Sequence, residues 1–91
     1  MDKDKKINLK VAGRSDPSSV AGSIVKNLNE GSSVCLTAIG AGAVNQMLKA
    51  VTIGRSMAAT AGDDLYFTSG FSTEIIKGEE KTAMKIFVKK R

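Results

Sequence analysis

The stretch Ala38-Ile39-Gly40-Ala41-Gly42-Ala43-Val44-Asn45-Gln46 marks the place where a strand gives way to a helix. The largely apolar run from Ser33 to Ile39 predicts the strand, and apolar residues at helical spacing beyond Gly42 predict the helix. Glycines at such a turn let backbone N–H groups approach an anion at the helix N-terminus, where the helix dipole is positive. They also suit close packing of the strand against the helix. Asn45 stands where a dinucleotide-binding fingerprint has its third glycine, so the turn is not a dinucleotide site. Two interpretations of the turn stay open: close packing, which we prefer, and a site for a phosphate.

The rest of the chain divides into elements by its apolar periodicity. The predicted elements are a strand over 7–11, a helix from Pro17 to Gly31, a strand over 33–39, a helix over 40–59, an extended segment over 65–76, a turn over 77–80 and a strand over 81–89. Right-handed crossovers in a β-α-β-α-β-β order place both helices on one face of the sheet. The prediction is therefore an α/β two-layer sandwich with a mixed four-stranded sheet and one open sheet face.

Length and composition limit the possible functions. The chain has 91 residues, which allows one domain over 1–91, with residues 1–5 expected to form a disordered tail. It has no histidine and a single cysteine, so His-based catalysis and the usual zinc sites are excluded. We expect no enzyme activity, no cofactor, no metal and no small-molecule substrate. No apolar run approaches the ~20 residues that span a bilayer, so we expect no membrane partner and a cytoplasmic protein.

The net charge of +5 is unevenly distributed. Residues 1–14 contain five basic and two acidic residues, and residues 15–80 contain four basic and seven acidic residues. Residues 81–91 contain five basic residues and no acidic residue. If the alternating apolar residues of the strands, including Leu65 and Phe67, face the helices, the open sheet face carries basic and aromatic side chains: Lys10, Tyr66, Lys85, Phe87 and Lys89. Such a face suits base stacking and phosphate attraction, although it also fits an ordinary solvated surface.

Small or flexible residues recur at intervals of three and four along the second helix. They are Ala43, Met47, Ala50, Gly54 and Ala58. Such residues allow close approach of another element, which is either the chain's own sheet or a second copy. We assign Met47, Ala50, Gly54 and Ala58 to an expected homodimer interface.

The chain resembles the stage V sporulation protein S family. The resemblance extends over Leu9-Lys10-Val11, residues 15–22, the glycine turn with Asn45 and Gln46, Lys49-Ala50-Val51 and residues 78–83. That bacterial family is linked to sporulation and cell-division control and is similar in fold to the Alba chromatin proteins, which bind DNA and RNA as dimers. The resemblance therefore implies an Alba-like fold, nucleic-acid binding and a homodimer. Alba proteins carry arginines around the glycine turn, whereas this chain has Ile39 and Ala41 there.

Two surfaces compete for the nucleic acid. One is an edge with backbone donors at two helix N-termini, formed by Arg14, the turn 40–42, Asn45, Gln46 and Lys49; the other is the open sheet face. We prefer the edge because the resemblance covers it most closely. The predicted nucleic-acid-binding residues are Lys10, Arg14, Ser15, Gly40, Gly42, Asn45, Gln46, Lys49 and Lys85. The predicted function is low-specificity binding of DNA or RNA by a regulatory protein; the alternative is a protein–protein regulator of sporulation or division that binds no nucleic acid.

Overall fold

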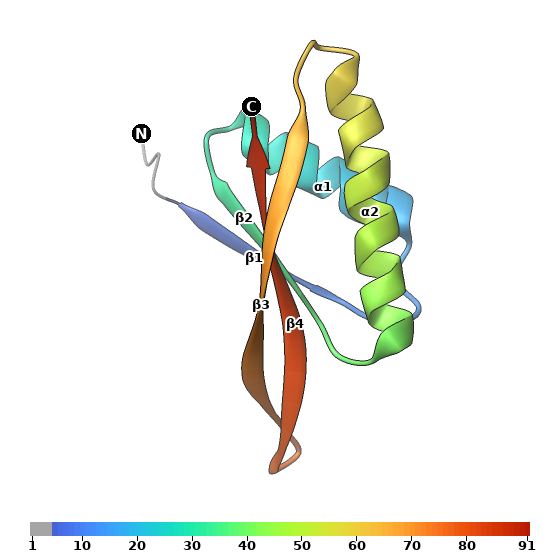
Figure 1. Cartoon of the computed structure of the whole chain (residues 1–91), viewed down its shortest axis with the longest axis vertical. Coiled ribbons are helices and arrows are strands. Elements are labelled where there is room, and N and C mark those ends of the chain that lie inside the picture. Colours follow the sequence, from blue (N-terminus) through green and yellow to red (C-terminus); the bar gives the residue numbers. More distant parts are fainter. Residues whose placement is uncertain (1–4) are drawn as a thin grey trace.

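The computed structural model describes residues 5–91, and its elements follow the predicted order (Figure 1). They are β1 (Lys6–Val11), α1 (Pro17–Asn29), β2 (Ser33–Ala38), α2 (Ala41–Ala59), β3 (Leu65–Ile76) and β4 (Glu79–Lys90). The expected tail falls mostly outside the described residues. Lys5 is described, and its carbonyl accepts a hydrogen bond from the Ser33 N–H at 2.9 Å, so its backbone is held against β2.

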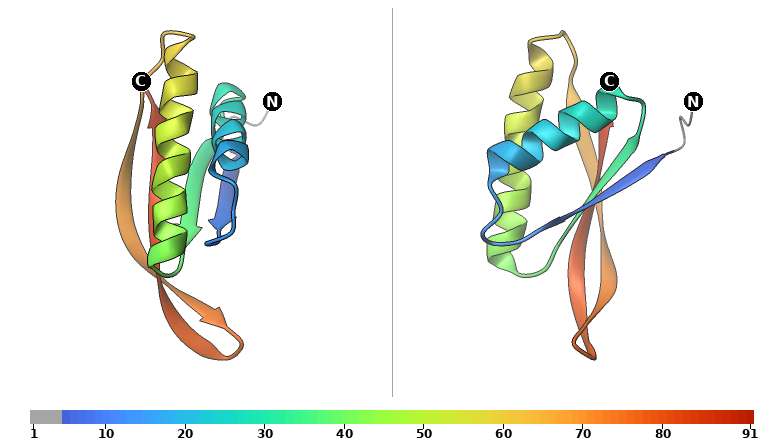
Figure 2. Two further views of the ribbon diagram at one scale, coloured as in Figure 1. Left: turned by 90° about the vertical axis from the view of Figure 1, so that its right-hand side faces the viewer. Right: turned by 180° about the vertical axis from the view of Figure 1, so that it is seen from behind.

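The sheet has the strand order β1-β2-β4-β3, with β1 parallel to β2 and the other neighbours antiparallel. Aligned apolar residues of the inner strands face the helices, as in the pairs Val34 with Val88 and Leu36 with Ile86. The core contains these residues together with Ile24 of α1 and Met47 of α2, which are fully buried. The predicted two-layer sandwich is confirmed, and the helices cross each other over the sheet (Figure 2). Within residues 5–91, neither helix is long and apolar enough to cross a membrane.

The residues expected to meet a second copy are instead buried within this chain. Met47 and Ala50 are completely buried, and Gly54 and Ala58 are buried as well. A Cβ placed on Gly54 would lie 3.6 Å from Leu65 Cδ1 of β3 and 3.7 Å from Val25 Cγ2 of α1. The small residues of α2 therefore bring it close to α1 and to the sheet, and the assignment of this face to a dimer interface was wrong.

The β3–β4 hairpin extends beyond the rest of the molecule (Figure 1). Only Met84–Val88 of β4 pair with β2, so the part of β4 before Met84 is bonded to β3 alone and forms a two-stranded ribbon. The turn is tighter than predicted, because Lys77 and Gly78 adopt positive φ values of 51° and 80° and let Ile76 pair with Glu79. In Figure 2 (left) the far end of this ribbon curves out of line with the remaining strands.

Exposed aromatic residues on this hairpin depart from the sequence expectation. Leu65 is buried as expected, but Phe67 is 40% exposed and Phe71 is 79% exposed. Both lie on the helix side of β3 by strand alternation, since Phe67 pairs with Val88 and Phe71 with Met84. The helix layer thus covers only the beginning of this side of β3.

The packing at Gly54 gives a first prediction. Gly54→Ala adds a methyl group at ordinary contact distance and should raise the free energy of unfolding by up to about 1 kcal/mol through helix propensity. Gly54→Leu overfills the space between α1 and β3 and should lower it by about 1–3 kcal/mol. Urea unfolding measures both changes. A Leu variant as stable as the unmodified chain would show that α1 and α2 are not in close contact here.

Candidate nucleic-acid interface

The loop after β1 and the first turns of α2 form one surface, which we call the edge. Within the loop, the Ser15 hydroxyl accepts a hydrogen bond from the Ala12 N–H at 2.9 Å. The Gln46 side-chain amide donates to the Ser15 carbonyl at 2.9 Å and so fastens the loop to α2. Gln46 is thus a structural link, which leaves exposed Asn45 as the amide of this turn that can meet a ligand.

The glycine turn leaves the N-terminus of α2 open. Gly40 is its N-cap with a φ of 88°, a conformation that favours glycine, and it has no side chain with which to cap the helix. The first N–H to bond back to the Gly40 carbonyl belongs to Val44, so the N–H groups of residues 41–43 have no helical partner. These donors lie at the positive end of the helix dipole, which is the arrangement that binds phosphate.

Close packing does not explain the two glycines of this turn. A Cβ on Gly40 or on Gly42 would meet no protein atom within 4 Å. Gly40 is required by its positive φ, whereas Gly42 has neither a positive φ nor a neighbour that a side chain would strike. The space outside the first turn of α2 is therefore open to another molecule, and the close-packing interpretation of this turn was wrong.

The N-terminus of α1 is already occupied. Asp16 caps it, with Oδ1 accepting from the Ser18 N–H at 3.2 Å and Oδ2 from the Ser19 hydroxyl at 2.9 Å. A carboxylate in this place uses the donors that an anion would need and repels a phosphate. The expectation of anion donors at two helix N-termini was therefore correct for α2 and wrong for α1.

The predicted basic residues lie on two different surfaces. Arg14 and Lys49 are exposed on the edge. Lys10 lines a groove of about 250 Å³ that also includes Ile39, Ala43 and Glu74, so it adjoins the edge from the sheet side. Lys85 pairs in register with Thr37, which in turn pairs with Lys10, and this row lies on the sheet face away from the helices. The structure therefore brings together the predicted edge residues but places Lys85 on the open face.

The open face consists of the alternate residues of each strand that point away from the helices. Its members around the sheet centre are Lys6, Asn8, Lys10, Cys35, Thr37, Tyr66, Thr68, Gly70, Lys85, Phe87 and Lys89. The Tyr66 ring already carries a cation on one face, because the Arg91 guanidinium lies 4.6 Å from its ring centroid. Phe87 is 42% exposed.

A cluster of charges beside Tyr66 joins α2 to the start of β3. Arg55 Nε lies 2.7 Å from Asp64 Oδ1, and Arg91 Nε lies 3.6 Å from Asp64 Oδ2. The hydrogen bond from Arg55 is the main reason that the pKa of Asp64 is lowered below its ordinary value. Asp64 therefore stays ionised at neutral pH and balances part of the charge of both arginines.

An exposed apolar surface was missed by the sequence analysis. Leu48 and Arg55 are seven residues apart on α2, so they share one side of it, and the Arg55–Asp64 pair shows that this side faces β3. Leu48 thus adjoins the exposed helix-side residues of β3, and we call Leu48, Phe67, Phe71 and Ile75 the apolar stripe. The apolar residues at alternate positions along 65–75 contained the signal, but the sequence analysis used only Leu65 and Phe67 and expected both to be buried within the chain.

Among residues 5–91 no three potential metal ligands of the His, Cys, Asp and Glu types gather into one group. Chemically, the edge offers backbone donors and two exposed cations to an anion, and the open face offers lysines around an aromatic ring.

The architecture is that of the Alba fold. A solved structure titled "Alba from Thermoplasma volcanium" superposes with a TM-score of 0.60 at 12% identity, over 90% of this chain and 98% of that one. Within this fold, the chain belongs to the Stage V sporulation protein S (SpoVS) family, whose model matches residues 7–91. The resemblance drawn from the sequence motifs is confirmed.

The link between Gln46 and Ser15 gives a second prediction. Gln46→Ala removes the hydrogen bond that fastens the loop after β1 to α2, and should lower the free energy of unfolding by about 1 kcal/mol. Urea unfolding measures this, and amide hydrogen exchange should speed up at residues 12–16. Asn45→Ala, at the exposed neighbouring position, is the matched control. Equal effects of the two variants would contradict the structural role of Gln46.

Proposed function

We propose that this member of the SpoVS family binds the phosphate backbone of DNA or RNA at the edge, and that it acts by binding and not by catalysis. One observation carries the proposal: the N-terminus of α2 has no side-chain cap, and a Cβ added to Gly40 or Gly42 there would meet no protein atom within 4 Å. The likeness to Alba supports the fold that presents this edge. Backbone donors and Arg14 and Lys49 beside them are groups that hold phosphate.

The edge is suited to binding with low sequence specificity. Backbone N–H groups and exposed cations contact phosphate, which is the same for every base. Recognition of a particular base requires side chains that hydrogen-bond to base edges. In the first turn of α2 only the exposed amide of Asn45 could do this. The nearby Asp16 carboxylate keeps the local charge small, so affinity depends strongly on the few cations present.

Charge reversal tests the edge. Arg14→Glu with Lys49→Glu should remove most binding to a 20-base-pair duplex DNA and should reduce the slope of log K against log salt by about 2. Lys5→Glu with Lys26→Glu makes the same change in net charge on exposed residues at the far ends of β1 and α1, and should leave much of the affinity. Fluorescence anisotropy at two salt concentrations measures both variants.

The result that would contradict the edge proposal is an equal loss of affinity in the two double variants. If the unmodified chain shows no salt-sensitive binding to DNA or RNA, the alternative of a protein–protein regulator takes its place.

We also propose that the chain forms a homodimer, with the apolar stripe as its contact surface. Phe71, just before the two-stranded ribbon begins, is 79% exposed, and Ile75, on the same side of β3, is 63% exposed. Large apolar side chains this exposed on one side of a strand are typical of an association surface. A second copy is the expected occupant because the resemblance to dimeric Alba proteins implies one.

The stripe can be tested without disturbing the core. Phe71→Glu should convert a dimer into a monomer, because it places a charge in the centre of the contact. Asn29→Glu, at the exposed end of α1, adds the same charge outside the stripe and should leave the dimer intact. Light scattering at high micromolar concentration measures the mass. A monomeric unmodified chain would overturn the dimer proposal.

A further inference from the structure

The centre of the open face is a platform of small and basic side chains around one aromatic ring. Phe87 pairs with Cys35 on one side and Thr68 on the other, and Cys35 pairs in turn with Asn8. In the next row Lys85 faces Gly70 across the hairpin. The two direct neighbours, Cys35 and Thr68, have small side chains, and 42% of Phe87 is exposed.

Four lysines surround this ring. Lys85 and Lys89 lie two residues before and after Phe87 on β4, which places them about 7 Å away along the strand. Lys6 and Lys10 lie on β1 at the same levels of the sheet. Among the described residues, none of the four has a carboxylate oxygen within 4.0 Å. Glu74, in the groove that includes Lys10, lies at the hairpin end of the platform.

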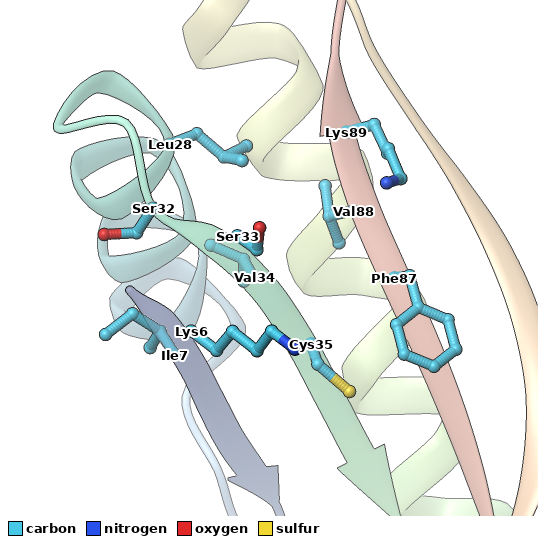
Figure 3. Close-up of a pocket in the computed structure, with 10 residues that line it drawn as sticks. All are labelled: Lys6, Ile7, Leu28, Ser32, Ser33, Val34, Cys35, Phe87, Val88 and Lys89. Carbon is cyan, nitrogen blue, oxygen red and sulfur yellow. The ribbon is translucent and has the colours of Figure 1, made fainter. Parts of the chain in front are cut away.

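A notch opens beside Phe87 where β2 and β4 separate (Figure 3). Its volume is about 360 Å³, which is within the range of small-ligand sites. Leu28, Val34 and Val88 supply apolar side chains from the helix side, whereas Lys6, Cys35, Phe87 and Lys89 line it from the open face. The notch therefore combines apolar walls with two ammonium groups at its rim, a combination that suits a flat aromatic group attached to an anion.

We propose that the open face is a second nucleic-acid site that takes a single strand, with one base stacked on Phe87 and the adjoining phosphates held by Lys85 and Lys89. The inference rests on the proposed function because both take nucleic acid as the ligand. It concerns a different surface, the open face, and a different form of the ligand, a single strand. A duplex keeps its bases stacked on each other and cannot offer one to Phe87, whereas a single strand can. Charge complementarity fixes the occupant as a polyanion.

The absence of tryptophan from the chain permits a direct test. Phe87→Trp installs a single indole at the platform, and its fluorescence should be quenched by a 12-nucleotide poly-dT strand but not by the matched duplex. Phe71→Trp places the indole on the opposite side of the sheet and should show little quenching. Equal quenching at the two positions, or none at position 87, would overturn the inference.

Affinity measurements separate stacking from charge. Phe87→Leu keeps an apolar residue but removes the ring, and should weaken binding of the single strand by about 5-fold to 100-fold. Tyr66→Leu is the matched control, because the Tyr66 ring is already occupied by Arg91. Lys85→Gln with Lys89→Gln should reduce the salt slope for the single strand by about 1.4. A Phe87→Leu variant with unchanged single-strand affinity would contradict the proposal.

The unmodified chain supplies its own reporter. Cys35 is the single cysteine and lies half-buried in the notch beside Phe87. A bound single strand should slow its reaction with N-ethylmaleimide, and the duplex should not. The Arg14→Glu with Lys49→Glu variant distinguishes the two proposals: it should lose duplex binding and keep protection of Cys35. If that variant loses binding of both the single strand and the duplex, the second site is overturned and the edge remains the proposed binding surface.

Discussion

The close approach of α1 and α2 on one side of the sheet determines the rest of this structure. The contact depends on Gly54, where a side chain would lie against Val25 and Leu65, and on fully buried Ala21 and Ala50. Because both crossovers return to the same side, both helices must share the space above four strands. Small residues at the crossing allow them to do so without lifting either helix from the sheet. The opposite sheet face is left uncovered as a direct consequence.

The parallel pairing of β1 and β2 has a second consequence. Carboxyl ends of parallel neighbours lie at the same edge of a sheet, so the loop after β1 and the turn after β2 emerge side by side. The hydrogen bond from Gln46 to Ser15 then fixes these two connections to each other. The edge is therefore produced by topology, and Gly40 and Gly42 determine that its helix N-terminus remains accessible.

The sequence predicted the element order and the position of the glycine turn because both depend on local patterns. Apolar periodicity defines a helix or a strand, and Gly40 with its positive φ is where such a turn requires glycine. The face of α2 that carries Gly54 was assigned wrongly for a physical reason. A stripe of small residues shows that something approaches closely, but the pattern is the same whether α1 or a second chain approaches.

The exposed aromatics show a related limit. Alternation placed Phe67 on the helix side, which was correct, and the structure places Phe71 on the same side. Alternation does not give the length of the helix layer. Nineteen residues of α2 extend about 28 Å, whereas twelve residues of β3 extend about 40 Å. The hairpin therefore runs past the end of α2, and Phe71 lies where no helix covers it. Only the relative lengths and positions of the elements in three dimensions reveal this.

The two proposed surfaces use different physical means to hold the same kind of polymer. The edge has few net charges, since Asp16 lies close to Arg14 in the chain, and it combines two cations with oriented backbone donors that salt screens weakly at contact distance. The open face has four lysines and no carboxylate paired with them in the described chain, so its attraction extends farther and is more sensitive to salt. Because the surfaces adjoin at Lys10, a strand leaving the platform can continue toward the N-terminus of α2 without crossing the helix layer. Taken together, the two proposals imply that one nucleic acid can contact both surfaces at a junction between its single-stranded and duplex regions.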